Sequence, residues 1–543
     1  MEESYFNQKL KYITFEKKPI LILLIICITG LLIRFHYVPY GLPVAGDALN
    51  GYLLYALDIS TLGHFPNYSL SQSGWPEFLS LFFMNYNSEN LIDYSNLQRS
   101  ISIILSGITV IPIFYICKKF FNNYYSLIGA TIFALEPRII INSTIGVSEP
   151  LCILAISLGI LFFLNVNKKI IYLAFAFFAW ATIIRPEGQF WFIAFSIAYL
   201  VRFRRKRKDL IMYLICLAVF LLVLSPIVMH RVECCESDMI FDRIIGEIKN
   251  YFPQEPIEQN ENNIVTPEEP VEQNENIAYG PNWINGIKLF GWSLIPVFII
   301  FVPIGLIPIF KQLKYPNYLL VLVPTVLAIP IMYSVSIAPD TRYVYPLFPI
   351  FCVISLFGIN WIGRNFKNEK LIVGLIFVGI IISSLGFLDF KKLDYEYRDE
   401  AFSIAKDIIV NVEGVNKGSL AERYIKQAEI ANKWPIYSTS GALELRDYEI
   451  KRLSIKEHTS LENFIISGKE KGLTHLLIDE NHHIPDYLLD VFYNEEKYSY
   501  LKNVYDSRDF GYQYHVKLYE INYDEINYDE INYDEINYDE IKN

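Results

Sequence analysis

Four charged residues stand at the ends of long apolar segments, where an ionised group is costly unless it is paired or hydrated. They are Asp47, Glu149, Arg185 and Arg342. A carboxylate there could take a proton from a hydroxyl group, and an arginine could bind a phosphate through two parallel hydrogen bonds. Because the hydropathy pattern places all four on one side of a membrane, we interpret them together as a candidate catalytic site.

Each of these residues also has an ordinary structural role open to it. Asp47 follows Gly46 at the start of a helical pattern, so it could be an N-cap, and Glu149 could simply stabilise a helix N-terminus. The two arginines could form local ion pairs with Glu187 and Asp340. Taken singly, each ordinary role is favoured, whereas the four residues together favour a functional site.

A second carboxylate follows Asp47 in the same helical pattern. If that helix runs unbroken, Asp47, Gly51, Leu54 and Asp58 share one face, so that two carboxylates point the same way. The alternative, which we favour, is that Asp58 is a solvated acid.

Signatures of nucleotide-driven or zinc-dependent chemistry are missing from the sequence. It contains no P-loop, no glycine-rich dinucleotide fingerprint, no zinc-ligand spacing and no nucleophile elbow. His482 and His483 could bind a metal, although loop histidines without that role are the better interpretation. Five of the seven cysteines lie in apolar segments, whereas Cys234 and Cys235 are adjacent and could pair with each other or between chains.

The apolar residues predict a multi-pass α-helical membrane protein. They make up 52% of the 543 residues, the mean hydropathy is +0.26, and charged residues make up only 19%. A helix needs roughly 20 apolar residues to cross the hydrocarbon core. Windows of that size predict about eleven transmembrane helices, at residues 19–36, 97–117, 123–141, 149–166, 169–184, 188–203, 210–230, 289–310, 316–337, 343–363 and 370–388.

The distribution of lysine and arginine gives the expected orientation. The predicted inside loops carry basic residues, including the run RFRRKRK at 202–208, while the outside segment 37–98 has none. We therefore expect a multi-pass protein of the cell membrane with a cytoplasmic N-terminus and an extracytoplasmic C-terminal domain. The basic run ends a helix, so we interpret it as an anchor at anionic lipid and not as a nucleic-acid site.

The sequence predicts three parts. Residues 1–388 form the membrane domain, with a first external loop at 37–96 that contains two surface helices and an acidic, partly disordered external loop at 231–288. Residues 389–521 form a small α/β domain, in which LTHLLIDE and YHVKLYEI read as strands. The tandem NYDEI units at 522–543 are an acidic, solvated tail.

Five motifs in order give the membrane part, residues 20–388, a family resemblance. They are GDALNGYLLYALDI from residue 46, GWPEFLSLFF from 74, INSTIGVSEPL from 141, IIRPEG from 183 and DTRYVYPLFPIF from 340. In this order and placement they resemble the GT-C superfamily of membrane glycosyltransferases, which includes protein O-mannosyltransferases and aminoarabinose transferases.

The resemblance implies transfer of a sugar from a polyprenyl-phosphate (dolichyl-phosphate) donor to a protein, lipid or glycan acceptor. Asp47 would be the general base of an inverting displacement, and Glu149 would position the acceptor or a cation. The donor phosphate would be bound by Arg342, with Arg185 and Tyr343. Further contacts to acceptor or donor are expected from Asp58, His64, Arg99 and Arg138. No cofactor is implied with certainty, and a divalent cation stays open.

The chain departs from the family pattern in two places. Many relatives have Asp-Glu where this chain has Asp47-Ala48, which weakens a two-carboxylate metal site. The C-terminal domain has no WWDYG-like motif, which argues against an oligosaccharyltransferase. Two other functions stay open, namely a transporter or flippase of lipid-linked sugars and a non-catalytic membrane scaffold.

Two triplets match the acceptor pattern for N-glycosylation. They are Asn67-Tyr68-Ser69 and Asn142-Ser143-Thr144. Such triplets are common by chance, so the sequence alone does not choose between them.

Overall fold

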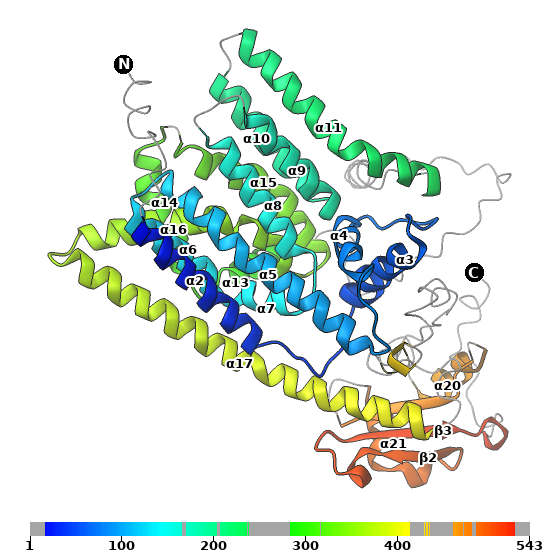
Figure 1. Cartoon of the computed structure of the whole chain (residues 1–543). Helices are drawn as coiled ribbons and strands as arrows, with labels where there is room; N and C mark the ends of the chain where they lie inside the picture. Colours follow the sequence, from blue (N-terminus) through cyan, green and yellow to red (C-terminus); the bar gives the residue numbers. More distant parts are fainter. Residues whose placement is uncertain are drawn as a thin grey trace, which may run out of the picture. The chain divides into compact units, whose positions relative to one another are not determined.

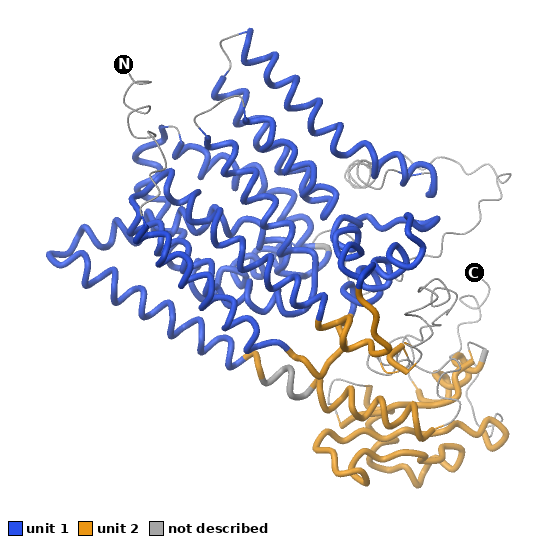
Figure 2. The backbone as a smooth tube through the Cα atoms, in the orientation of Figure 1, with its two compact units in different colours: residues 1–38, 46–85, 97–390 blue, residues 39–45, 86–96, 391–543 orange. Residues whose placement is uncertain are grey.

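The architecture comes from a computed structural model, in which the chain forms two compact units (Figures 1 and 2). The first unit consists of residues 1–38, 46–85 and 97–390, and the second of residues 39–45, 86–96 and 391–543. The residues that the structure describes are 17–165, 170–203, 207–235, 237, 283–314, 316–412, 428, 430–432, 434, 460–470, 472–480 and 485–526.

The first unit is built from helices (Figure 1). Its described elements are α2 (Lys17–His36), η1 (Asp47–Leu53), α3 (Leu54–Leu62), α4 (Gly74–Phe83), α5 (Leu91–Lys118, from residue 97 on), α6 (Asn123–Leu135), α7 (Pro137–Thr144), α8 (Glu149–Phe163), α9 (Ile171–Ile184), α10 (Gly188–Phe203), α11 (Arg207–Cys235), α13 (Trp283–Ser293), α14 (Phe298–Lys311), α15 (Leu319–Ile337), η3 (Thr341–Leu347), α16 (Phe348–Arg364) and α17 (Glu369–Asn411, up to residue 390).

Six of the described helices are long and apolar enough to cross a membrane, and the number is eight if each of two bent pairs counts as one span. The bent pairs are α6 with α7, at 46°, and α13 with α14, at 93°. This confirms the predicted α-helical multi-pass membrane fold.

The number of full-length spans differs from the eleven predicted segments. Three of these segments form the shorter helices α8, α9 and α10, with 15, 14 and 16 residues. At about 1.5 Å per residue they measure roughly 21–24 Å, less than the ~30 Å hydrocarbon core. One cause is local, because Arg185 precedes a proline and adopts an extended conformation (φ −146°, ψ 128°) that ends α9.

The helices of the first unit pack closely. Helix α8 lies against α9, α9 against α11, and α14 against α16. At Gly305 in α14, an added Cβ atom would lie 1.9 Å from the backbone oxygen of Ile354 in α16. Only glycine permits this approach of the two backbones, which is a common way for membrane helices to associate.

The first loop contains the two helical stretches that the sequence predicts. The first is η1, a π-helix, which continues directly into α3, and the second is α4. Helix α4 buries Trp75, Leu79 and Phe83. At the end of α11, Cys234 and Cys235 form a disulfide with each other, one of the two pairings left open by the sequence.

The second unit contains a three-stranded antiparallel sheet. The strands are β1 (His475–Asp479), β2 (Leu501–Asp506) and β3 (Val516–Ile521), in the order β1-β3-β2. The other described elements are α20 (Leu461–Glu470), α21 (Asp486–Tyr493) and the short 3-10 turns η5 (Glu495–Lys497), η6 (Ser507–Phe510) and η7 (Tyr523–Glu525), together with the C-terminal part of α17.

Alternation along β3 creates two hydrophobic cores, one on each face of the sheet. Tyr519 and Ile521 join a cluster with residues of α20 and α21, while Val516 and Leu518 join a cluster with residues of α17. This confirms the predicted small C-terminal α/β domain.

Three details of this unit differ from the sequence analysis. The pattern of residues 485–501 predicts one helix, whereas the structure has the shorter helix α21, the turn η5 and, from Leu501, strand β2. Helix α17 runs without a break across the expected boundary at 388/389. Residues 39–45 and 86–96 of the first loop belong to this unit. Most of the acidic loop at 231–288 and most of the NYDEI tail lie outside the described residues.

Candidate active site

The guanidinium group of Arg342 lies between carboxylates from different elements. Its Nη2 is 3.3 Å from Oδ2 of Asp47, and its Nη1 is 3.7 Å from Oε1 of Glu149. Its Nε donates a hydrogen bond of 2.5 Å to Oδ2 of Asp340. Arg342 therefore joins the start of the first loop to the start of α8.

A second arginine contacts Glu149 from another side. Nη1 of Arg185 donates a hydrogen bond to Oε1 of Glu149, and its Nε donates one of 3.3 Å to Glu187. The guanidinium carbon lies 5.5 Å from the ring centre of Tyr343, within the range of a cation–π contact. The expected local ion pairs with Glu187 and Asp340 thus form, but in addition the two arginines share Glu149.

Asp47, Arg342, Glu149 and Arg185 form one cluster with alternating charges, which we call the charged cluster. Its members differ in exposure: the side chain of Asp47 is 64% exposed and that of Arg342 27%, against 6% for Arg185 and 0% for Glu149. A substrate can therefore reach Asp47 and Arg342, whereas Glu149 and Arg185 form a buried ion pair behind them.

Local sequence determines how the buried pair and Arg342 are placed. Glu149 is the first residue of α8, and Pro150 fits the first helical turn because its missing N–H would have no partner there. Asp340 is the N-cap of η3 and accepts hydrogen bonds from both the backbone N–H, at 2.9 Å, and the side chain of Arg342. This double contact holds the arginine at the beginning of η3.

Asp47 is placed by an unusual backbone. The preceding Gly46 has φ 57° and ψ −132°, a conformation that side chains disfavour, and it occupies the N-cap position of η1. The N-cap role considered for Asp47 is therefore wrong, since this residue lies in the first helical turn and its side chain turns to Arg342. A π-helix is rare and is frequently found at functional sites.

Tyr52 lies next to the charged cluster and was missed by the sequence analysis. Its hydroxyl group donates a hydrogen bond to Gln72 and lies 3.3 Å from Oγ of Ser148. Burial raises the pKa of Tyr52 well above its ordinary value, and the negative charge of Glu149 adds to this effect. The tyrosine stays protonated and can serve as a hydrogen-bond donor at the site. An aromatic residue five positions after an acid is no recognisable signal in a single sequence.

The backbone carbonyl of Gly146 connects the elements around the cluster. It accepts hydrogen bonds from Nε2 of Gln98, at 2.6 Å, and from Nε1 of Trp75, at 3.1 Å. Gln98 also donates to the carbonyl of Ala48 at 3.0 Å. Residues of α4 and α5 thereby hold the turn before α8 and the first turn of η1.

Four other predicted contact residues lie outside the charged cluster, and Asp58 is the first of them. It is fully buried and accepts a hydrogen bond from Tyr68. The expected face shared with Asp47 assumed an unbroken α-helix, whereas Asp47–Leu53 form π-helical turns with a different register. The favoured alternative of a solvated acid is wrong as well.

The remaining three lie in different surroundings. His64 is exposed, and its Nδ1 lies 2.8 Å from the backbone oxygen of Phe65. Arg99 is buried on α5. Arg138 on α7 donates hydrogen bonds to the backbone oxygens of Trp292 and Ile295, at 2.6 and 3.0 Å, so it fastens the connection between α13 and α14.

The charge of the site comes from arginines and carboxylates. Four acids (Asp47, Glu149, Glu187 and Asp340) contact two arginines (Arg185 and Arg342). Among the described residues, no group of three or more His, Cys, Asp or Glu side chains could hold a metal ion. We therefore derive no step through a divalent cation.

A comparison with protein-family models matches residues 95–230 to the dolichyl-phosphate-mannose-protein mannosyltransferase family. This segment includes Glu149 and Arg185 of the charged cluster. No curated protein matches the chain at a significant level.

Solved structures of two membrane glycosyltransferases are similar to the chain. The apo oligosaccharyltransferase of Archaeoglobus fulgidus matches with a TM-score of 0.53 at 11% identity, over 85% of this chain and 69% of the other. The same enzyme in complex with an inhibitory peptide and a dolichol-phosphate matches with a TM-score of 0.48 at 10% identity, over 86% and 70%. ArnT of Cupriavidus metallidurans matches with a TM-score of 0.47 at 10% identity, over 92% and 97%.

Proposed function

We propose that this multi-pass membrane protein, which has the fold of the GT-C membrane glycosyltransferases, transfers a sugar from a polyprenyl-phosphate donor to an acceptor hydroxyl group. The observation that carries the proposal is the position of Arg342. It is half-buried between an exposed carboxylate, Asp47, and a buried one, Glu149. A general base and a phosphate-binding cation thus lie side by side where a substrate can reach both.

The reaction is an inverting displacement. The acceptor hydroxyl oxygen attacks the anomeric carbon of the donor sugar and forms the new glycosidic bond, while the bond from that carbon to the phosphate oxygen breaks. Asp47 takes the hydroxyl proton, a contribution of about 10²–10⁴ in rate for a general base. The polyprenyl phosphate leaves with the bonding electron pair.

Arg342 stabilises the charge that develops on the leaving phosphate. Its guanidinium group stays charged and presents several N–H donors in a planar fork that matches phosphate oxygens. The 3.3 Å contact with Asp47 can be exchanged for one with phosphate, because both side chains are accessible. The donor phosphate is then bound beside Asp47. Arg342 is already in place to stabilise the negative charge that develops in the transition state.

Glu149 and Arg185 act mainly by placing Arg342. Glu149 is fully buried and contacts both arginines through Oε1. Its Oε2 has no hydrogen-bond partner in the part of the chain that the structure describes. We assign Glu149 a second role, in which this enclosed oxygen accepts a hydrogen bond from the acceptor once the side chains in front of it have moved aside.

The family match over residues 95–230 supports a proposal for the donor and the acceptor. The description of that family names dolichyl-phosphate mannose as donor and protein as acceptor. We therefore propose a hexose linked to a polyprenyl or dolichyl phosphate as donor and a protein as acceptor.

The topology of the proposal follows the positive-inside rule. The first loop carries Asp47 and contains no lysine or arginine from residue 37 to 98, so we place it and the C-terminal domain outside the cell membrane. The N-terminus is then cytoplasmic. The lipid donor reaches the site from the bilayer, and the protein acceptor reaches it from the water side.

The experiment is donor turnover by the purified protein in lipid. Dolichyl-phosphate mannose and glucose are supplied with a membrane-protein extract as acceptor, and released dolichyl phosphate is quantified. We expect release that requires the acceptor and is lost in Arg342→Gln. Release without any acceptor, or equal release by the variant, contradicts the proposal. Movement of intact donor across the bilayer without release favours a flippase.

A further inference from the structure

The two N-glycosylation triplets lie in opposite environments in the structure. Modification attaches a bulky glycan to the side-chain amide of asparagine, so the acceptor must lie on the surface of the folded protein. This requirement separates Asn67-Tyr68-Ser69 from Asn142-Ser143-Thr144.

The second triplet is enclosed in the membrane unit. Asn142 is 2% exposed in α7, and the two residues after it are both 0% exposed. A glycan on this asparagine cannot be accommodated by the packed helices. Asn142 is therefore excluded as an acceptor.

The first triplet lies in the connection between α3 and α4, where Asn67 is exposed and Ser69 is half-buried. Among the residues that the structure describes, none forms a hydrogen bond with the side chain of Asn67. Its amide nitrogen is therefore accessible to a reaction partner.

The residues on both sides of Asn67 are anchored. The hydroxyl group of Tyr68 donates a hydrogen bond to the buried Asp58, and its ring lies edge-on to Tyr55 at a centroid distance of 5.2 Å. Pro66 on the other side is buried. The exposed asparagine is thus held at the surface between two inward-facing residues, so a substituent on it leaves the core in place.

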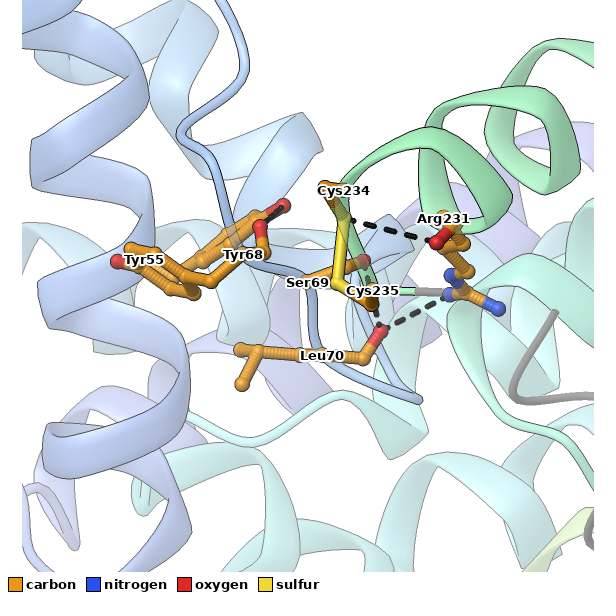
Figure 3. Close-up of a disulfide and its surroundings, with 7 residues drawn as sticks. All are labelled: Tyr55, Tyr68, Ser69, Leu70, Arg231, Cys234 and Cys235. Carbon is orange, nitrogen blue, oxygen red and sulfur yellow. Dashed lines mark hydrogen bonds between the residues drawn. A yellow bond between two sulfur atoms is a disulfide. The ribbon is translucent and has the colours of Figure 1, made fainter. Parts of the chain in front are cut away.

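The following residues of the connection are fixed by α11 (Figure 3). The fully buried Arg231 donates hydrogen bonds to the backbone oxygen of Leu70, at 3.0 Å, and to Oγ of Ser73, at 2.9 Å. Figure 3 shows the backbone oxygen of Leu70 pointing toward the guanidinium group of Arg231, while the side chain of Leu70 points the other way. The triplet therefore has a defined position.

We propose that Asn67 is an N-glycosylation site. The side-chain amide nitrogen attacks the anomeric carbon of a lipid-linked oligosaccharide and forms a C–N bond. The C–O bond to the lipid phosphate breaks, and the amide proton leaves with the phosphate. The lipid-linked oligosaccharide is the donor, and a cellular oligosaccharyltransferase catalyses the transfer. The inference rests on the extracytoplasmic placement of the first loop in the proposed function, and not on its transferase chemistry.

The test is mass spectrometry of the protein purified from the membranes of its natural source. Chymotrypsin is required, because the segment 37–98 has no lysine or arginine for trypsin to cut. We expect the peptide with Asn67 to carry a glycan with sugar fragment ions, and the peptide with Asn142 to be bare. Ser69→Ala and Asn67→Gln, expressed in the same source, should lose the modification, while Asn142→Gln should keep it.

A bare Asn67 peptide overturns the proposal, and so does a glycan that persists in Ser69→Ala. A separate measurement tests the placement of the loop. Thr61 is exposed at the end of α3, and a Thr61→Cys variant should react with a membrane-impermeant maleimide in intact cells, above the background of the unmodified chain. Labelling with a bare Asn67 refutes only the glycosylation site, whereas absent labelling refutes the topology as well. Donor turnover stays an independent measurement.

Discussion

Nη1 of Arg342 lies 3.7 Å from Oε1 of Glu149, although the two residues come from separate halves of the membrane unit. Arg342 is accessible and Glu149 is fully buried, so the contact connects the surface of the site to its interior. The geometry of the charged cluster depends on this contact, because both arginines contact Oε1 of Glu149.

The first prediction concerns the stability of the buried pair. Glu149→Gln leaves Arg185 buried without its main counter-charge, and breaking a buried ion pair costs about 3–5 kcal/mol. We expect a clear loss of thermal stability in detergent or lipid, measured as a lower unfolding midpoint. Glu187→Gln is the matched control, since Glu187 contacts the same arginine at 3.3 Å but is partly exposed. Equal effects of the two substitutions contradict the assignment of Glu149 as the central partner.

The second prediction concerns the hydroxyl group of Tyr52. Tyr52→Phe removes one donor from the wall of the site but keeps the buried ring, so we expect a fall of about tenfold in turnover with stability changed by only ~1 kcal/mol. The control is Tyr55→Phe, because the hydroxyl group of Tyr55 contacts the backbone of Tyr68, away from the charged cluster. If both variants turn over donor like the unmodified protein, Tyr52 has no part in the reaction.

The third prediction concerns the pH dependence of the C-terminal unit. Burial lowers the pKa of His475 on β1, and the nearby Glu520 offsets part of this effect. The folded unit therefore binds the proton less well than the unfolded chain does, so stability falls as the pH drops from the ordinary histidine pKa toward the lower folded value. Above that pH window His475 is neutral in both the folded and the unfolded state, so its protonation does not change the stability of the unit.

Hydrogen exchange of the β1 amides in the full-length protein measures this dependence. As the pH falls below the ordinary histidine pKa, protection should decrease more steeply in the unmodified protein than in His475→Gln. The same pH dependence in both proteins would show that other groups are responsible.

The fourth prediction concerns divalent cations. Arg342 and Arg185 supply permanent positive charge, and among the described residues no group of three metal-ligating side chains exists. We expect turnover to persist after dialysis against EDTA. Loss of activity with EDTA and its recovery with Mn²⁺ or Mg²⁺ would mean that Asp47 and Glu149 bind a cation together with the substrate.

The sequence was most informative at positions where an ionised side chain costs free energy, next to apolar segments. Asp47, Glu149, Arg185 and Arg342 could be selected because ionised residues beside apolar segments are rare and need a reason. The structure brings all four together. The apolar segments likewise predicted the helical membrane fold, since uncharged apolar runs of this length are typical of helices that cross a bilayer.

The sequence failed where the outcome depends on local backbone geometry or on partners far along the chain. The π-helix η1 has the composition of an ordinary helix, so the register between Asp47 and Asp58 could not be predicted. Strand β2 pairs with β3, and this long-range pairing could not be predicted from a segment that contains Lys502 and Asn503. Tyr52 acquires its position from Gln72 and Ser148, which are distant in sequence.

The central claim divides the reaction between two neighbouring residues, with Asp47 as base and Arg342 as binder of the donor phosphate. Separate measurement of donor binding and of sugar transfer at saturating donor tests this division most directly. Asp47→Asn should keep donor affinity and lose transfer by about 10²–10⁴. Arg342→Gln should lose donor affinity, and Asp509→Asn, an exposed aspartate of the second unit, should change neither. Transfer at the normal rate by Asp47→Asn, or normal donor affinity and transfer in Arg342→Gln, would contradict the account.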